Sequence, residues 1–144
     1  MKKPKKASLG DQRDFLIGGS RKVIFSAKET DGDIYLVEGI MPAGSEVPVH
    51  VHELEDEIFH VLEGKVELRL GEESFGGEEG DIIYLPRGVK HGIKTIGSSK
   101  ARVLNYVIPG KNFEDFFEKL NELGSSASDD EKSDLAAVHK IKFL

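Results

Sequence analysis

The sequence contains no cysteine among its 144 residues. The chain can therefore form no disulfide, no thiolate nucleophile and no cysteine-ligated zinc or iron–sulfur site. It also lacks the residue order of a Ser-His-Asp triad, a phosphate-binding loop and a zinc-protease motif. Because the sequence has no cysteine, cysteine usage does not indicate whether the protein works in an oxidising or a reducing compartment.

Long apolar segments are also missing, and none approaches the length of a membrane-spanning helix. The basic start MKKPKKASLG is not followed by the apolar part of a signal peptide, so we expect a cytoplasmic protein. The formal net charge of −6 argues against nucleic acid or an anionic membrane as a partner. At 144 residues, 38% of them hydrophobic, the chain is expected to form one domain around one core.

Short apolar or alternating segments, separated by glycine and proline, dominate the first three quarters of the sequence. In residues 64–70, Val66, Leu68 and Leu70 alternate with charged residues, which is typical of a half-buried strand. Further strands are expected at residues 21–26, 34–41, 57–62, 81–85, 90–95 and 101–108, with a short one near Ser74 and Phe75. Many short strands at close spacing indicate a β-sandwich or barrel.

The apolar period changes to that of a helix after residue 112. The helical stripe consists of Phe113, Phe116, Phe117, Leu120 and Leu123. We predict Asn112 as its N-cap and Gly124 as the residue just past its end. Its aromatic face is expected to lie on the outside of the barrel.

A capping-box pattern at Ser128 and Glu131 predicts a second helix, which ends at about His139. The final apolar residues, IKFL, are expected to dock on the barrel. These patterns divide the chain into a flexible basic tail (residues 1–10), a β-barrel (11–111) and a helical extension packed on it (112–144).

Three potential metal ligands lie close together in residues 44–64. His50 and His52 are two residues apart, so on a strand their imidazoles point to the same side. Glu57 opens the next apolar run, and its carboxylate can face both imidazoles if the two runs pair as neighbouring strands. His91 follows a turn at residues 86–88 and adds a fourth donor. Three imidazoles and one carboxylate suit a divalent transition metal.

The same residues carry a resemblance to the cupin superfamily. The first cupin motif, G-x5-H-x-H-x4-E-x6-G, is matched by Gly44, His50, His52, Glu57 and Gly64. The second, G-x5-P-x-G-x2-H-x3-N, is matched by Gly80, Pro86, Gly88 and His91, with Thr95 where asparagine is usual. The chain resembles the single-domain, quercetin-dioxygenase-like cupins, which implies an all-β jelly roll (a double-stranded β-helix barrel) with one or two C-terminal helices.

That resemblance implies one divalent ion of iron, manganese, nickel, cobalt, copper or zinc, bound by His50, His52, Glu57 and His91. It favours a dioxygenase-like oxidoreductase that acts on a small enol, phenol or diketone, with Glu57 as ligand and catalytic proton acceptor. Two alternatives stay open, because cupins host unrelated chemistries. One is a metal-dependent isomerase or lyase, and the other is a non-enzymatic module that binds a small ligand.

Other polar residues receive structural interpretations. His60 is out of phase with Glu57 on its strand, so we expect it to point away from the metal, and His139 is expected on the surface. The remaining acidic residues beside the ligands, Glu53, Glu55 and Asp56, are interpreted as a solvated loop. Arg69, Arg87 and Lys90 are the only basic residues expected near the barrel mouth.

The edges of a small jelly roll need to be covered. We therefore expect a homodimer, with residues 11–26 as the edge partner. Apart from a second copy, the expected partner is a small-molecule substrate or ligand.

Overall fold

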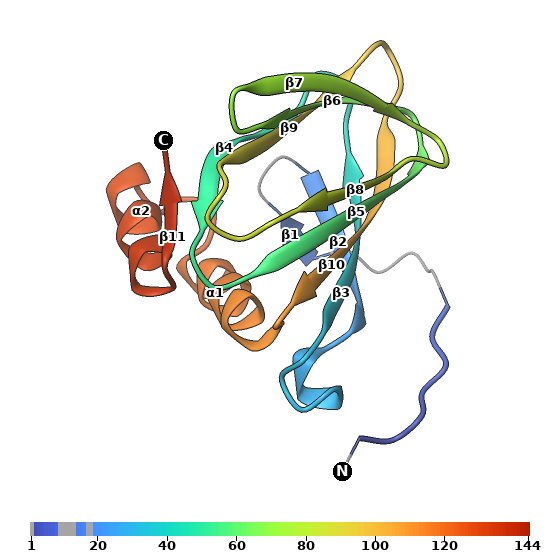
Figure 1. Ribbon diagram of the computed structural model, residues 1–144. Helices are drawn as coiled ribbons and strands as arrows, with labels where there is room; N and C mark the ends of the chain where they lie inside the picture. Colours follow the sequence, from blue (N-terminus) through green and yellow to red (C-terminus); the bar gives the residue numbers. More distant parts are fainter. Residues whose placement is uncertain (1, 9–13, 17–18) are drawn as a thin grey trace.

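Two antiparallel sheets face each other and enclose the core (Figure 1). The computed structural model describes residues 2–8, 14–16 and 19–144. In spatial order, sheet A contains β1 (Asp14–Leu16), β2 (Gly19–Phe25), β3 (Tyr35–Met41), β10 (Ala101–Ile108), β5 (Asp56–Glu63) and β8 (Ile82–Leu85). Sheet B contains β11 (Ile141–Phe143), β4 (Glu46–His52), β9 (His91–Ile96), β6 (Lys65–Leu70) and β7 (Glu73–Glu78). The predicted all-β jelly roll is confirmed.

Alternation along the strands places the core between the sheets. In β6, Val66 and Leu68 are fully buried, whereas Glu67 and Arg69 are exposed. Successive side chains of a strand point to opposite faces, so each strand contributes every second residue to the interior. These inward residues form a cluster of Met41, Phe59, Val61, Val66, Leu68, Ile83, Leu85, Ile93, Ala101 and Val103. Full burial of one such large side chain contributes about 1.5–3 kcal/mol.

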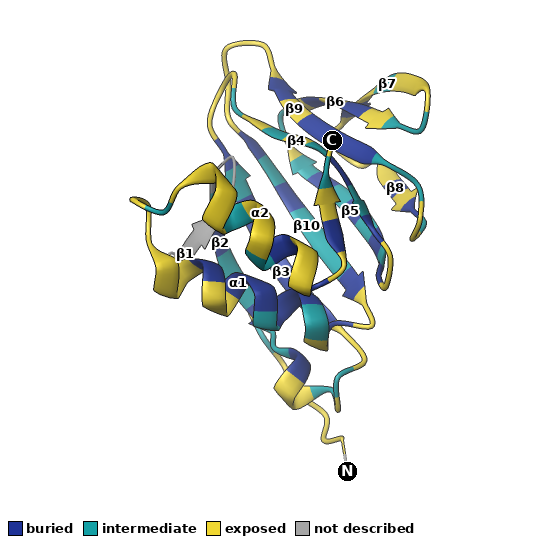
Figure 2. Ribbon diagram, turned by 90° about the vertical axis from the view of Figure 1, so that its left-hand side faces the viewer, coloured by how far each residue is buried: buried dark blue, intermediate teal, exposed yellow. Residues whose placement is uncertain are grey.

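Helix α1 (Lys111–Leu123) lies across the gap between the two sheets (Figure 1). The predicted stripe is confirmed at Phe113, Phe116, Phe117 and Leu120, which are buried, and Figure 2 shows this buried face turned toward the sheets. Its expected position on the outside of the barrel is wrong, because Phe113 and Phe117 line the interior cavity. The aromatic face packs on Tyr35, Val37 and Val107, whose side chains would otherwise stand open to water at this end.

The start of α1 also differs from the prediction. Its N-cap is Gly110, not Asn112, and no side chain caps the helix. Gly110 lies so close to Tyr35 that a Cβ atom at this position would overlap the Tyr35 backbone. The start of the helix therefore packs directly against β3 without a capping side chain. The side chain of Asn112 makes other contacts.

The first turn of α1 is anchored to a short 3₁₀ helix, η1 (Ala27–Glu29), by the buried carboxylate of Glu114. Its Oε1 accepts hydrogen bonds from Ser26 Oγ at 2.7 Å and from the backbone N–H of Ala27 at 3.0 Å. At its other end the helix stops at Gly124, which has a φ of 79°, a backbone conformation that glycine adopts readily. The predicted end of the helix is confirmed.

The second helix, α2 (Asp129–Val138), has the predicted capping box at Ser128 and Glu131. After it the chain forms β11, which pairs with β4 so that Ile141 lies opposite His52 and Phe143 opposite His50. The last residues therefore dock on the barrel, as predicted, but they do so as an added strand of sheet B. The extension is not wholly helical.

The prediction that His139 lies on the surface is wrong. Only 5% of this residue is exposed, since its ring packs on Phe116 with the centroids 5.7 Å apart. Its Nδ1–H donates to the carbonyl of Leu135 at 2.8 Å. His139 follows α2 on the side that faces α1, a relationship that helical periodicity alone does not reveal.

At the N-terminus, Lys2 pairs with Asp33 and Lys5 pairs with Glu29. Residues 1 and 9–10 of the predicted tail, and residues 11–13 and 17–18 of the predicted edge partner, lie outside the described residues. Within the part that is described, β2 pairs with β1 on one side and with β3 on the other. No helix in that part is long and apolar enough to cross a bilayer.

Candidate metal centre

The four predicted ligands meet inside the barrel. His50 and His52 lie on β4, and His91 begins β9 directly opposite His50. The His50–His52 run and the Glu57 run do not pair as neighbouring strands, because β4 belongs to sheet B and β5 to sheet A. Glu57 instead reaches the imidazoles across the barrel interior, since inward-pointing side chains of opposite sheets face each other.

The ligand atoms of these residues, His50, His52, Glu57 and His91, all lie within 4.8 Å of one another, and all four residues are buried. The Oε2 atom of Glu57 is 2.9 Å from His91 Nε2 and 3.3 Å from His52 Nε2. Two ligand atoms bound to one ion at about 2.1 Å and at right angles lie about 3.0 Å apart. The spacing of the cluster therefore suits a single small cation.

Hydrogen bonds orient two of the imidazoles. The Nδ1 of His50 lies 2.7 Å from the carbonyl of Pro48, and the Nδ1 of His52 lies 2.9 Å from Glu55 Oε1. Both partners are acceptors, so each Nδ1 donates a proton, and in the neutral ring Nε2 is the nitrogen that keeps its lone pair. Metal-binding histidines show this arrangement, in which the second ring nitrogen donates to a carboxylate or carbonyl.

Glu57 is oriented in the same way by an amide. Asn105 on β10 donates from Nδ2 to Glu57 Oε1 at 3.0 Å, which leaves Oε2 directed at the imidazoles. Besides His91 Nδ1, three atoms of the cluster are buried without a hydrogen-bond partner among the described residues, namely His52 Nε2, His91 Nε2 and Glu57 Oε2. Buried polar atoms without partners are rare, and one cation between them would satisfy all three. The donor set therefore fits a metal ion.

Burial and charge also prepare these groups for a cation. Burial, with the neighbouring His91 and His52, lowers the pKa of His50 from 6.5 to about 3. Burial opposes the charged form of Glu57, but His52 and His91 outweigh it and hold the pKa of Glu57 well below its usual range. Burial opposes protonation of His52, yet Glu57 and Glu55 outweigh it and raise the pKa of His52. Near pH 6.5, binding of a metal must therefore displace more protons from His52 than from His50.

The interpretation of Glu55 as part of a solvated loop is wrong. Its side chain is buried, and while Oε1 accepts from His52, Oε2 accepts from Asn112 Nδ2 at 2.9 Å. Asn112 Nδ2 also donates to the carbonyl of His139 at 2.7 Å. A continuous series of hydrogen bonds thus connects the His52 ring to α1 and to the residue after α2.

Aromatic side chains from the C-terminal segment pack against the imidazoles of His50 and His52. The Phe113 ring is stacked on His52, with the centroids 4.7 Å apart and the planes 24° apart. The Phe143 ring is 5.3 Å from that of His50. Each histidine of β4 is therefore held by an aromatic ring from a residue that follows β10 in the sequence.

The cluster opens into a cavity between the sheets. His50, Glu57 and His91 line one side, and apolar residues that include Val37, Phe59, Phe113 and Phe117 line most of the rest. The volume of the cavity is about 60 Å³. A cavity needs at least about 10–15 Å³ to hold one water, so this one has room for several waters or one small ligand.

Two further polar atoms belong to this cavity. The Tyr35 hydroxyl and Asn105 Oδ1 are buried without a hydrogen bond among the residues that the structure describes, and both residues line the cavity. Asn105 carries a signal that sequence reasoning missed: it stands between the inward-pointing Val103 and Val107 on an alternating strand. No comparable signal distinguishes Glu55 from its acidic neighbours.

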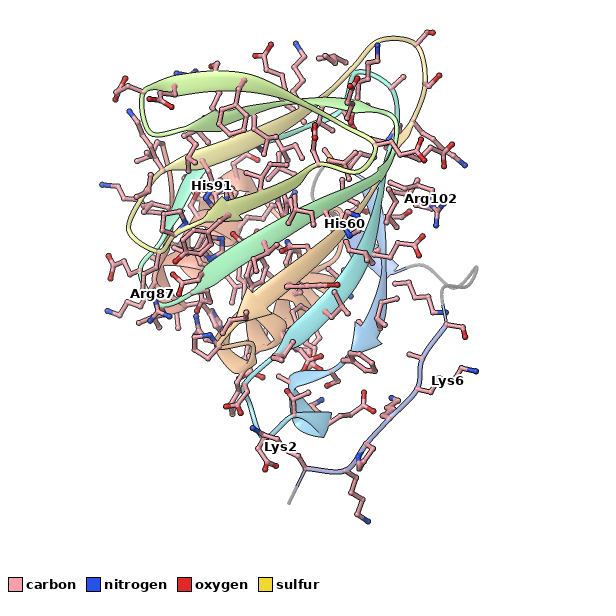
Figure 3. All side chains as sticks on the ribbon, turned by 45° about the vertical axis from the view of Figure 1, so that its right-hand side comes forward. Lys2, Lys6, His60, Arg87, His91 and Arg102 are labelled. Atoms are coloured by element: carbon pink, nitrogen blue, oxygen red, sulfur yellow. The ribbon has the colours of Figure 1, made fainter. Side chains whose placement is uncertain are left out.

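The remaining predicted residues lie away from the cluster. His60 contributes to an apolar groove on the outer face of sheet A, which agrees with its expected direction (Figure 3). Thr95 is buried and its hydroxyl has no hydrogen bond within the described part of the chain. Arg87 pairs with Asp56, and Lys90 with Glu72, so the charges of both basic side chains are balanced on the surface.

Two facing antiparallel sheets around buried histidines and a glutamate define a class of protein, a β-barrel with a cluster suited to a metal ion. Residues 36–107 match the family described as the cupin domain, and the chain belongs to this family.

Individual relatives agree with this assignment. The chain is 36% identical over 80 residues to an uncharacterised protein of Methanocaldococcus jannaschii, a match that covers 56% of this chain and 64% of the relative. It is 27% identical over 111 residues to quercetin 2,3-dioxygenase of Bacillus subtilis, covering 76% of this chain and 32% of the relative. The chain thus spans less than two thirds of the length of either relative. A solved RmlC-like cupin from Shewanella frigidimarina superposes with a TM-score of 0.64 at 22% identity, covering 81% of this chain and 99% of that one.

Proposed function

We propose that this cupin is a metal-dependent, dioxygenase-like oxidoreductase that acts on a small enol, phenol or diketone. One observation carries the proposal: the buried cluster of three histidines and one glutamate opens into a small cavity with a largely apolar lining. The similarity to quercetin 2,3-dioxygenase supports the reaction class.

A bound divalent transition metal would act as a Lewis acid for an enolate or phenolate oxygen and, if redox-active, would provide for reaction with dioxygen. The chain supplies the setting for this chemistry. His50, His52, His91 and Glu57 would hold the ion, and the apolar wall would exclude water. Excluding water strengthens the attraction between the ion and an anionic substrate oxygen.

The cavity also limits the substrate. Its free space suits a ligand of few non-hydrogen atoms, so acetylacetone and catechol are better probes than a flavonol. Among the described residues that line it there is no lysine or arginine. A phosphorylated sugar would find no cation in the lining, which disfavours an isomerase with such a substrate.

Glu57 has two proposed roles that compete. A carboxylate whose pKa lies well below its usual range is a good ligand and a poor proton acceptor. We therefore expect Glu57 to act first as a ligand. It can take a proton from an enol or phenol only if its contacts with His52 and His91 lengthen, while Asn105 continues to hold Oε1.

Oxygen uptake tests this proposal. Iron- or nickel-loaded protein should consume one dioxygen per molecule of acetylacetone or catechol converted. The variants His52→Ala and His91→Ala should not, whereas His60→Ala, outside the cluster, should behave as the wild type. Binding of these compounds without oxygen uptake or product would instead support a ligand-binding module.

A further inference from the structure

We propose that Asn112, on the helix beyond the matched cupin region, is a positioning residue of the metal centre and acts through Glu55 on His52. The inference rests on the metal site of the proposed function. It assigns a role to a segment, residues 108–144, that the family match at residues 36–107 does not include.

The geometry of the Asn112 amide allows one orientation. Its Nδ2 is 2.9 Å from Glu55 Oε2 and 2.7 Å from the carbonyl of His139, and both partners are acceptors. A rotated amide would turn its oxygen toward a carboxylate and a carbonyl, so the two N–H bonds must point this way. Asn112 therefore uses both of its donors to join Glu55 to the end of α2.

Glu55 transmits this constraint to the ligand. With Oε2 held by Asn112, its Oε1 accepts the Nδ1–H of His52 at 2.9 Å. His52 and Glu55 are both only 1% exposed, so water does not compete for these bonds. A carboxylate behind a ligating imidazole fixes its tautomer and ring direction and makes Nε2 a stronger donor to the metal. Without Asn112, the carboxylate would lose the hydrogen bond that holds its Oε2 while Oε1 accepts from His52.

The surroundings of Asn112 indicate more than helix stability. A capping role is excluded because the N-cap is Gly110. The next residue, Phe113, stacks on the same imidazole that Glu55 holds. One turn of α1 thus fixes His52 both at its edge and at its face.

The test compares cobalt binding by four proteins: wild type, Asn112→Ala, Glu55→Gln and Asn121→Ala. Asn121 is a matched control, since it is exposed on the same helix. Loss of a group behind a metal ligand typically costs about 10–100-fold in affinity. We expect losses of that size in Asn112→Ala and Glu55→Gln, with a changed visible spectrum of the bound cobalt, and no change in Asn121→Ala. If Asn112→Ala does not fold, Glu55→Gln decides, because it preserves the volume of the side chain.

A second measurement needs no metal. The Nδ1–H of His52 should give a slowly exchanging NMR signal in metal-free wild type and Asn121→Ala, and this signal should be lost in Asn112→Ala. Cobalt affinities of Asn112→Ala and Glu55→Gln within twofold of the wild type would overturn the inference. If the wild type itself binds no metal, the proposed function fails, and the NMR signal alone then decides whether Asn112 and Glu55 hold His52.

Discussion

The ring of Phe113 lies nearly parallel to the imidazole of His52, with the centroids 4.7 Å apart. Phe113 also contacts Phe116 and Phe117, so it joins the aromatic face of α1 to the metal cluster. Removal of this ring should open a void against the cluster. We expect Phe113→Ala to lower the free energy of unfolding by about 3–5 kcal/mol, measured by urea denaturation of metal-free protein. Leu123→Ala, at an exposed position of the same helix, should cost much less. A loss below 1 kcal/mol in Phe113→Ala would show that α1 is not part of the core.

The second prediction concerns metal content. Protein purified without chelator should carry about one divalent transition metal per chain, and removal of the metal should lower the melting temperature. An ion at 100 times its dissociation constant adds about 2.7 kcal/mol of stability. His50→Ala and Glu57→Ala should abolish this shift and still give a folded β protein. The control is His60→Ala, which should retain both the metal and the shift. Absence of metal after reconstitution of the wild type would contradict the assignment.

The third prediction concerns pH. The pKa of His50 is lowered to about 3, so between this value and 6.5 the unfolded chain binds a proton that the folded chain does not. Metal-free protein should therefore lose stability as the pH falls below 6.5, by up to about 1.4 kcal/mol per pH unit from this group. The raised pKa of His52 works in the opposite direction. Its contribution is complete below 6.5 and is lost as the pH rises through the folded-state value.

The same two histidines shape the pH dependence of metal binding. Because protonated His52 cannot bind a metal, affinity should begin to decline with acidification above pH 6.5, earlier than for a free imidazole. NMR titration of the metal-free protein should show His52 protonated and His50 neutral at pH 6. The opposite order, or a metal affinity that is constant between pH 5.5 and 8, would contradict this account.

The fourth prediction is a homodimer that forms through the outer face of sheet A, whereas the sequence alone suggested residues 11–26. An apolar groove on the outer face of sheet A takes residues from five strands, namely Phe25, Leu36, Ile58, Ile82 and Tyr106. The corresponding face of sheet B carries exposed Lys65, Glu67, Arg69 and Lys94. Antiparallel sheets that face water normally show the second pattern. The outer face of sheet A is therefore the surface that we expect a second copy to cover.

Size and charge favour a second copy. Five strands that lie about 4.8 Å apart and are about 25 Å long give this face an area of about 600 Å². A stable interface buries about 800 Å² per partner, which is of similar size. Arg102 and Arg87, toward opposite ends of this face (Figure 3), are paired with Glu38 and Asp56, so two copies would meet without strong repulsion. Sedimentation equilibrium should give a dimer for the wild type and for Lys94→Glu, and a monomer for Ile82→Glu. A monomeric wild type at tens of micromolar would refute the predicted homodimer.

Local patterns and the motif resemblance were enough to predict the barrel and the four residues that meet in the buried cluster. Alternation in β6 and the spacing of His50, His52, Glu57 and His91 depend on residues a few positions apart, whose directions the strand geometry fixes. Whether the runs of His50 and Glu57 pair as neighbouring strands could not be predicted, because that geometry fixes the direction of a side chain but not the sheet to which its strand belongs.

The groups behind the ligands could not be predicted in this way. Asn112 and Glu55 are 57 positions apart, and each has a plausible local role, as a helix cap or as a solvated acid. Only the packing of α1 across the gap between the sheets brings them together. The inward position of Asn105 is different, since a polar residue between two buried valines on one strand is a signal that alternation does provide.

The pairing of β11 with β4 has a consequence for transplanting this site. A designer who moved residues 36–107 into another scaffold would carry over all four ligand side chains and the amide of Asn105. The graft would lack Phe143 behind His50 and Asn112 behind Glu55, and the backbone of β4 would have an unpaired edge. The smallest portable form of this cluster is therefore larger than the set of residues that would touch a metal.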